Sequence, residues 1–266
     1  MKLHPASLLL PSLLFVWAWP AQGQDEMITD RPDQSESTAI VGRGVFQLET
    51  GITIERDESA LVVQENREWA GSLLRWGLSE RFELRFGFTG YTEAVTEVAD
   101  GKTTASGLGD AELGFKLRLR DGQGRSPAIA FLAATTLPVG EEGLSSERYD
   151  PTVRFAFDHE LGDALGLGWN VGYRRESAPG PAGVEHQDYV LYSASLGISA
   201  GERWGTYFEL FGDVAAGGSG EDSHSFDTGI TYLLTPDLQL DLEAGLGLNG
   251  AAPDTFFGFG VSWRRR

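Results

Sequence analysis

The chain alternates apolar and polar residues over most of its length, and this alternation is the feature that most restricts its fold. In residues 81–89, Phe82, Leu84, Phe86 and Phe88 fall on one face, and charged residues occupy most of the other. A period of two residues is typical of a β-strand with one apolar and one polar face. Almost no segment keeps a helical period. The sequence therefore predicts an all-β fold.

Twelve segments follow this pattern, and several are long enough to cross a bilayer at about 45° of tilt. The predicted strands cover residues 44–56, 68–78, 81–93, 106–120, 127–137, 149–160, 164–175, 187–200, 203–214, 222–234, 237–248 and 254–264. Connections after odd-numbered strands are long, and those after even-numbered strands are mostly short. The long connections cover residues 57–67, 94–105, 138–148, 176–186, 215–221 and 249–253. This regular alternation places all long loops at one end of an up-and-down sheet, as in a transmembrane barrel.

A soluble barrel would show the same alternation, because the sequence does not reveal which face points outward. Two features favour a membrane barrel. The polar face carries many charges of both signs, and a barrel of twelve strands leaves a lumen too wide for side chains to fill. Aromatic residues near strand ends are typical of an interfacial girdle; they are Trp76, Tyr91, Trp169, Tyr173, Tyr189, Trp204, Tyr232 and Trp263. We therefore predict a 12-stranded antiparallel up-and-down transmembrane β-barrel over residues 44–266.

The first residues have the features of an export signal. A basic residue precedes an apolar run from Ala6 to Trp19, and small residues follow at positions 21 and 23. The run is too short and too interrupted by proline to cross a bilayer. We predict a signal peptide over residues 1–23, which implies export to the cell outer membrane of a Gram-negative type of cell. Residues 24–43 would then form a short periplasmic leader before the barrel.

Composition argues against several classes of protein. The sequence contains no cysteine, which excludes disulfides, thiolate metal sites and cysteine nucleophiles. Its 21 Lys and Arg against 39 Asp and Glu give a net charge of −18, which argues against nucleic acid as a partner. The sequence has no phosphate-binding loop, zinc-ligand spacing or calcium-loop spacing. We therefore expect no cofactor and no bound metal.

The histidines after the signal peptide do not form an evident catalytic group. They are His159, His186 and His224, and two serines flank the last of them. Adjacent residues of a strand point to opposite faces, so these serines cannot share a face with His224. We expect no enzymatic activity, with an outer-membrane barrel hydrolase as the second alternative.

The stretch before the first strand resembles a known family. Residues 28–37 read Ile-Thr-Asp-Arg-Pro-Asp-Gln-Ser-Glu-Ser, and residues 44–51 read Gly-Val-Phe-Gln-Leu-Glu-Thr-Gly. These segments resemble the outer-membrane transporter family associated with the MetA pathway of phenol degradation, which also includes the secretion channel for functional amyloid subunits. The resemblance implies an outer-membrane channel. Both uptake of small solutes and export of a polypeptide are attached to this family.

Charged and polar residues supply two groups of candidate site residues. The first group precedes the barrel and is interpreted as a plug that enters the lumen, with a solvated leader as the alternative; it consists of Asp30, Arg31, Pro32, Asp33, Gln34 and Glu36. The second group is predicted to line the lumen, where opposite charges form ladders and set the local field. It consists of Gln47, Glu49, Glu55, Arg75, Glu83, Arg85, Asp110, Glu112, Lys116, Arg118, Arg154, Asp158, Arg174, Glu209, Asp213, Asp227, Asp241 and Glu243.

The sequence thus predicts an outer-membrane channel that passes small solutes, with aromatic or hydrophobic compounds as the expectation that the family resemblance adds. An export channel for an amyloid-type polypeptide is the first alternative. Expected partners are outer-membrane lipid, the solute or peptide, and the outer-membrane assembly machinery, while the oligomeric state stays open. Barrels of this class usually end on an aromatic residue, whereas here Arg264, Arg265 and Arg266 follow Trp263.

Overall fold

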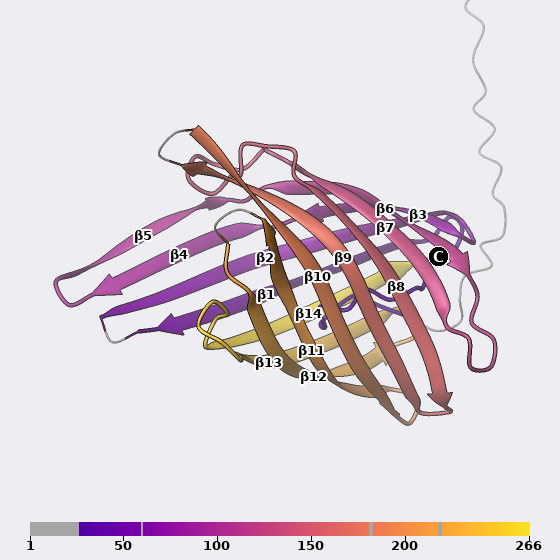
Figure 1. The fold of residues 1–266 in the computed structure, drawn as a ribbon. Helices are drawn as coiled ribbons and strands as arrows, with labels where there is room; N and C mark the ends of the chain where they lie inside the picture. Colours follow the sequence, from indigo (N-terminus) through magenta and orange to yellow (C-terminus); the bar gives the residue numbers. More distant parts are fainter. Residues whose placement is uncertain (1–26, 60, 181–182, 218–219) are drawn as a thin grey trace, which may run out of the picture.

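The computed structural model describes residues 27–59, 61–180, 183–217 and 220–266 (Figure 1). The predicted signal peptide over residues 1–23 lies outside the described residues. Within the described ranges, no helix is long and apolar enough to cross a membrane. The strands of this part of the chain are β1 (Phe46–Glu58), β2 (Val62–Ser79), β3 (Phe82–Phe88), β4 (Tyr91–Val98), β5 (Gly101–Leu108), β6 (Ala111–Arg120), β7 (Ala128–Leu137), β8 (Pro151–Gly162), β9 (Leu165–Gly180), β10 (Gly183–Ala200), β11 (Trp204–Gly217), β12 (Ser223–Thr235), β13 (Leu238–Gly247) and β14 (Thr255–Arg265).

Twelve of these strands close into an antiparallel barrel. Pairing runs from β1 through β2 and β3 to β6, and then in sequence order to β14. The last strand returns to pair with the first, from Phe46 opposite Arg265 to Arg56 opposite Thr255. Because β14 pairs with β1, the ring has no open edge. The predicted 12-stranded antiparallel barrel is confirmed, with two further strands added to it.

The two further strands form a hairpin that extends the wall beyond the ring (Figure 1). β4 continues β3 after Gly90 and pairs with the outer half of β2, while β5 pairs with β4 and leads into β6. The predicted loop over residues 94–105 is therefore wrong. Side chains of β5 are almost all exposed. A strand with both faces in water needs no apolar face, so its sequence loses the alternation that identifies strands.

The same reason explains two other predicted loops that the structure corrects mostly to strand. β1 ends at Glu58 and β2 begins at Val62, so most of the predicted loop over residues 57–67 is paired backbone. The predicted loop over residues 176–186 likewise belongs largely to hairpin β9–β10. Of the predicted loop over residues 215–221, residues 215–217 form the end of β11, and residues 220 and 221 are loop as predicted. Longer connections remain at residues 138–150 and 248–254. All of these lie at one end, which we call the hairpin rim; the short turns lie at the other, the turn rim.

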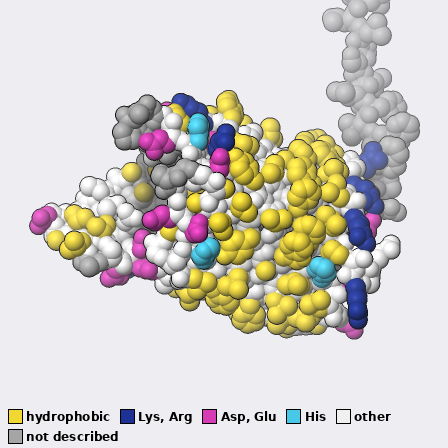
Figure 2. Space-filling model, viewed as in Figure 1, with side chains coloured by type: hydrophobic (Ala, Val, Ile, Leu, Met, Phe, Trp, Pro, Cys, Tyr) yellow, Lys and Arg dark blue, Asp and Glu magenta, His cyan; other side chains and the backbone are white. Residues whose placement is uncertain are grey.

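Apolar side chains cover the outside of the barrel, and charged side chains fill the inside. Figure 2 shows the apolar band across the wall, with acidic residues toward the hairpin rim and basic residues along the turn rim. Large apolar residues on the outer face are exposed, whereas the largest fully buried side chains are mostly charged or polar; they include Arg75, Lys116, Gln47, Glu49, Glu83, Glu209, Asp227 and Asp241. This arrangement inverts that of a soluble barrel and supports the membrane alternative.

Three of the predicted girdle aromatics, Trp76, Trp204 and Tyr232, lie in close aromatic pairs near the turn rim. Phe46 lies 5.3 Å from Trp76, and Trp204 lies 4.4 Å from Tyr232, measured between ring centroids. Tyr189 departs from the prediction, because the guanidinium of Arg174 lies 5.5 Å from its ring centroid. Its ring therefore contacts a lumen-lining arginine and does not belong to the outer girdle.

Removing residues 91–108 should leave the barrel intact. The deletion joins Gly90 to Gly109, and the two glycines then connect Thr89 to Asp110, whose backbones already share a hydrogen bond of 3.1 Å. Gly-Gly is a favoured two-residue hairpin connection. We expect a heat-modifiable folded band in SDS–PAGE and an unfolding midpoint close to that of the full chain. Loss of that band would contradict ring closure through β3 and β6.

Candidate functional site

Residues 27–43 lie inside the barrel, and we call them the luminal strip. The strip has no regular secondary structure, and its indigo trace crosses the space enclosed by the strands (Figure 1). Thr38, Ile40 and Val41 are each no more than 3% exposed. An irregular segment can be buried only if its backbone polar groups find partners, so the contacts between strip and wall explain its position.

Carboxylates of the wall accept hydrogen bonds from the backbone of the strip. The N–H groups involved belong to Asp30 and Arg31 (to Glu49 Oε2, 2.9 and 3.0 Å), Gln34 (to Glu209 Oε2, 2.7 Å), Thr38 (to Asp158 Oδ2, 2.7 Å) and Val41 (to Glu83 Oε2, 3.0 Å). The four acids come from β1, β11, β8 and β3, on different sides of the ring. The wall therefore holds the strip by side-chain contacts to its backbone.

Asp30 makes the most concentrated charge contact of the strip. Its carboxylate accepts hydrogen bonds from Lys116 Nζ at 2.8 and 2.9 Å and from Arg85 Nη1 at 2.5 Å. Arg75 Nη1 lies 3.0 Å from the same carboxylate. These cations stand on β2, β3 and β6 and are almost completely buried. One carboxylate of the strip therefore joins three neighbouring strands.

Glu36 extends this network along the strip. Both of its carboxylate oxygens accept hydrogen bonds from Arg85 Nη2 at 2.9 Å. Its backbone N–H donates to Asn170 Oδ1 at 2.7 Å, and Asn170 Nδ2 donates to its carbonyl oxygen at 2.9 Å. The side-chain amide of Asn170 thus makes the two hydrogen bonds to the backbone of Glu36 that a neighbouring strand would make. These bonds attach the strip to β9.

Two glycines make room for Arg31. Gly51 and Gly260 are directly paired across β1 and β14, and a Cβ atom at either position would collide with the Arg31 guanidinium. The guanidinium occupies this gap and lies 3.6 Å from Asp241. Arg31 therefore points toward β1, β13 and β14, whereas the carboxylate of Asp30 points toward β2, β3 and β6.

Inward charges are unevenly distributed around the ring, although the acids Glu83, Glu112 and Asp158 stand on the same strands as most of the cations. Strands β2 to β9 carry a group of cations, namely Arg75, Arg85, Lys116, Arg118, Arg154 and Arg174. Strands β11 to β13 carry an excess of acids, namely Glu209, Asp213, Asp227, Asp241 and Glu243. The charges of the strip are complementary to those of the wall at two residues. Asp30 contacts cations of β2, β3 and β6, and Arg31 lies near the acid Asp241 of β13.

Asp33 does not match the division, because it lies on the acidic side. Burial, followed by the charges of Glu209 and Asp227, raises the pKa of Asp33 well above its usual value. Burial would also raise the pKa of Asp30, but Arg75 and the other two cations outweigh it and hold that pKa well below its usual value. Two aspartates three residues apart therefore have opposite electrostatic environments.

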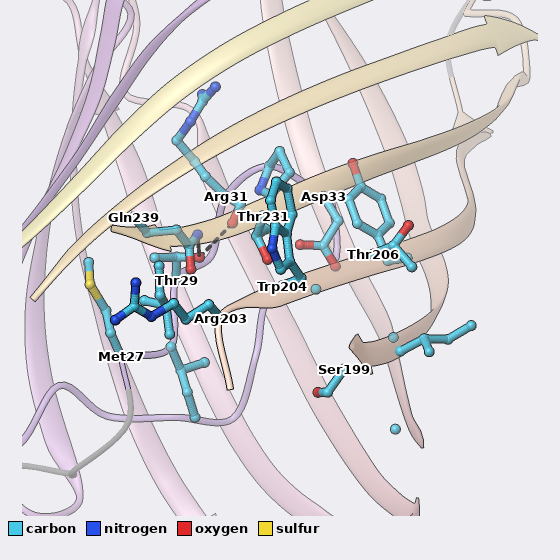
Figure 3. Close-up of a pocket in the computed structure, with 18 of the residues that line it drawn as sticks. Met27, Thr29, Arg31, Asp33, Ser199, Arg203, Trp204, Thr206, Thr231 and Gln239 are labelled. Atoms are coloured by element: carbon cyan, nitrogen blue, oxygen red, sulfur yellow. Dashed lines mark hydrogen bonds between the residues drawn. The ribbon is translucent and has the colours of Figure 1, made fainter. Parts of the chain in front are cut away.

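The strip separates two cavities. One of 330 Å³ opens toward the turn rim, where Met27, Arg203 and Trp204 line it (Figure 3). The other, of 390 Å³, lies on the side of the hairpin rim. Three consecutive residues, Arg31 to Asp33, line both cavities. The strip is therefore a thin partition across the lumen.

The candidate lumen residues fall into two groups in the structure. Those in contact with the strip are Gln47, Glu49, Arg75, Glu83, Arg85, Lys116, Asp158, Glu209 and Asp241. Those that line cavities without such a contact are Glu55, Asp110, Glu112, Arg118, Arg154, Arg174, Asp213 and Glu243. Asp227 is buried beside them and accepts a hydrogen bond from Tyr207. Among the candidate plug residues, Pro32 and Asp33 line cavities, and Gln34 binds through its backbone.

Sequence reasoning missed several hydroxyl groups that hold the strip. Ser35 Oγ lies 2.7 Å from Ser193 Oγ, and Thr38 Oγ1 donates to Asp158 at 2.6 Å. Gln239 Nε2 donates to Thr29 Oγ1 at 2.8 Å (Figure 3). The alternation of β10 could have identified Ser193 as an inward residue, because Ser193 falls on the same face as the other inward residues of that strand. The hydroxyls of an irregular segment carry no such signal.

The histidines in the described part of the chain do not form a catalytic arrangement of the serine-hydrolase type. Ser177 Oγ contacts both Asp150 Oδ1 at 2.6 Å and His186 Nδ1 at 2.8 Å, so the serine lies between acid and histidine. A catalytic triad requires the histidine in the middle. His224 contacts the hydroxyl of Tyr192 at 2.9 Å. Among the described residues, no group of three or more His, Asp or Glu could hold a metal ion.

Together, the closed ring, apolar outer face, charged lumen and internal strip define the chain as an outer-membrane β-barrel. Residues 29–265 match the family described as "Putative MetA-pathway of phenol degradation", and the chain belongs to this family. No curated protein matches the chain at a significant level.

Solved structures share the fold. The COG4313 outer membrane channel from Pseudomonas putida F1 is similar with a TM-score of 0.63 and 15% identity, over 88% of this chain and 98% of that chain. The NanC porin has a TM-score of 0.53 and 9% identity, over 82% and 98%. The KdgM porin, solved in complex with disordered oligogalacturonate, has a TM-score of 0.50 and 10% identity, over the same shares. At these identities, the likeness concerns the fold.

Asp30→Asn and Asp33→Asn should affect the strip in opposite directions. The first change leaves three buried cations short of an anion, and breaking a buried ion pair costs about 3–5 kcal/mol. The second removes a carboxylate from an acidic surrounding. A spin label at Gln34→Cys would report strip mobility, since the chain has no native cysteine. We expect a mobile label with Asp30→Asn and an unchanged or less mobile label with Asp33→Asn. Equal effects would contradict the charge division.

The strip should loosen as pH rises through the raised pKa of Asp33. A carboxyl group whose pKa is raised in the docked state stabilises docking below that pKa and opposes it above. Asp30 has the opposite sign: its contribution is present above the usual carboxyl pKa and is lost only as pH falls through its lowered value. The same spin label, measured from pH 5 to pH 9, should become more mobile at the alkaline end. With Asp33→Asn, we expect this alkaline change to disappear.

Proposed function

We propose that this chain is an outer-membrane channel for small solutes, without enzymatic activity, and that the luminal strip is its gate. The proposal rests on one observation, the separation of two cavities by Arg31, Pro32 and Asp33. A solute that crosses from the hairpin rim to the turn rim must pass this partition. Displacement of the strip would join the two cavities into one path.

The way in which the strip is held is compatible with such displacement. Its polar contacts with the wall are side-chain hydrogen bonds and ion pairs, and none of its residues pairs with a strand. The ring closes through backbone pairing of β1 with β14, in which no residue of the strip takes part. Release of the strip would therefore cost its own contacts and leave the barrel folded.

The finer parts of the proposal concern the substrate and the route to the membrane. Small aromatic or hydrophobic compounds are supported by the family to which the chain belongs and by two phenylalanines, Phe211 and Phe256, in the cavity on the hairpin side. We also propose that residues 1–23 direct export and are removed, and that the turn rim faces the periplasm. Outer-membrane lipid would surround the apolar band, after insertion by the assembly machinery.

Export of a polypeptide is the second candidate function, and one observation favours it. The wall already binds an irregular polypeptide, because Glu49, Glu83, Asp158 and Glu209 accept hydrogen bonds from backbone N–H groups of the strip. Every polypeptide offers such groups whatever its sequence. If export were the function, an exported segment would replace the strip on these acids.

A disulfide between the strip and the wall should block the channel. The hydroxyl oxygens of Ser35 and Ser193 lie 2.7 Å apart, close enough for two cysteines to form an S–S bond of about 2.05 Å. The natural sequence has no cysteine, so Ser35→Cys with Ser193→Cys would form the only pair. In planar bilayers we expect conductance under reducing conditions and a large drop after oxidation, because the bonded strip cannot leave the lumen.

Single variants carrying only Ser35→Cys or Ser193→Cys provide the control and should conduct equally under both conditions. Equal conductance of the oxidised and reduced pair would contradict the gate. Absence of conductance in every form, including one that lacks residues 27–43, would contradict the channel itself. Conductance that is blocked by an unfolded polypeptide and not by small solutes would favour export.

A further inference from the structure

Arg154 differs from the other inward cations of the cationic side near the strip, because it has no partner. Arg75, Arg85 and Lys116 bind the strip or its supporting acids, and Arg174 pairs with Asp213. Within the described residues, Arg154 makes no hydrogen bond or ion pair, and its Nε atom is buried without an acceptor. A buried polar group without a partner is costly, so an anion that reaches this guanidinium would relieve that cost.

The surrounding wall holds Arg154 in place without neutralising it. Arg154 on β8 is paired with Gly172 on β9, and a Cβ atom at Gly172 would lie 2.8 Å from Arg154 Cγ. The stem of the arginine therefore lies across a position kept free of a side chain. Glu112 on β6 interacts with it only at longer range. The arginine is positioned, and its charge remains available.

Two cavities of the lumen that share lining residues lie beside this guanidinium. A cavity of 390 Å³ and a smaller one of 170 Å³ are both lined by Arg154 and Phe211. Phe256 completes an apolar side of the larger cavity, with its ring 6.0 Å from that of Phe211 in an edge arrangement. A cavity of about 150 Å³ is enough to hold benzene, so a single-ring molecule fits here.

The acids of the larger cavity restrict the charge of a ligand. The wall contributes Glu55, Glu68 and Glu243 together with Arg154, and the strip contributes Asp30, Asp33 and Glu36 together with Arg31, which lies near Asp241. A second negative charge on a ligand would approach these glutamates, whereas a single carboxylate can pair with the arginine through two parallel hydrogen bonds. A neutral ring can then lie against the two phenylalanines.

We propose that this place is a binding subsite for a small aromatic monocarboxylate. Arg154 binds the carboxylate, Phe211 and Phe256 contact the ring, and the glutamates exclude dianions. The inference rests on the proposed channel function, because the subsite lies on the hairpin side of the strip, where a solute would arrive before the gate. It adds to that function a charge requirement at a named residue.

Calorimetric titration of the detergent-folded full chain with sodium benzoate tests the subsite. We expect saturable binding that weakens at least tenfold with Arg154→Gln and less with Arg154→Lys, which keeps the charge but loses the two-bond geometry. Phthalate, which carries two carboxylates, should bind more weakly than benzoate. Arg118→Gln is the matched control, because Arg118 is also an inward arginine but lies near Asp121 and lines a different cavity. It should leave benzoate binding unchanged.

Several results would overturn the proposal: no saturable benzoate binding to the unaltered chain, equal binding by Arg154→Gln, or phthalate binding as tight as benzoate. Heat-modifiable migration in SDS–PAGE checks that each variant is folded, and Arg154→Lys serves if Arg154→Gln is not. The outcome is separate from that of the channel experiment. The reduced double variant, Ser35→Cys with Ser193→Cys, does not need Arg154 to conduct ions. The channel proposal and the subsite proposal can therefore fail independently of each other.

Discussion

The carboxylate of Asp30, surrounded by Lys116, Arg85 and Arg75, is the contact on which the interior of this barrel depends. Three cations on adjacent strands, almost fully removed from water, would repel one another in an empty lumen. The strip supplies the anion that makes their burial tolerable, and Glu83 and Glu49 of the wall complete the neutralisation of Arg75. The inner face of β2, β3 and β6 therefore matches the charge of the strip while the strip occupies the lumen.

The barrel could be predicted from the sequence because the membrane imposes a rule on every residue of a crossing strand. Lipid requires an apolar side chain at every second position, and the lumen accepts a polar one between them. The rule ends where the strand leaves the lipid. Residues 62–68 of β2 read Val-Val-Gln-Glu-Asn-Arg-Glu and remain paired, but water on both faces removes the period. For this reason the hairpins that rise above the ring were predicted as loops.

The sequence predicts which charged residues belong to the candidate site, but it does not predict which of them form ion pairs with one another. The charges of residues 30–36 and of the inward faces are visible in the sequence, but which charges meet depends on the register of strands far apart in the chain. Asp30 and Lys116 are separated by 86 residues. Asp30 and Asp33 look equivalent in the sequence, and only the arrangement of strands gives one of them cations and the other acids. The same holds for Arg154 and Arg85. The alternation places both arginines on the inward face, but Arg85 has acidic partners, whereas Arg154 has none among the described residues.

The division of charge around the lumen connects the strip with the subsite. Because the strip carries both signs, it neutralises the cations of β2, β3 and β6 and reaches Asp241 through Arg31, but its contacts stop short of Arg154. Within the described residues, the hairpin-side cavity thus keeps Arg154 without a partner, facing a group of glutamates. A solute that enters from the hairpin rim is exposed to the electric field of Arg154 and the glutamates before it reaches the strip. Selection by charge and control of passage would then depend on different residues, so that a change at Arg154 could alter what enters while the contacts of Asp30 continue to hold the strip.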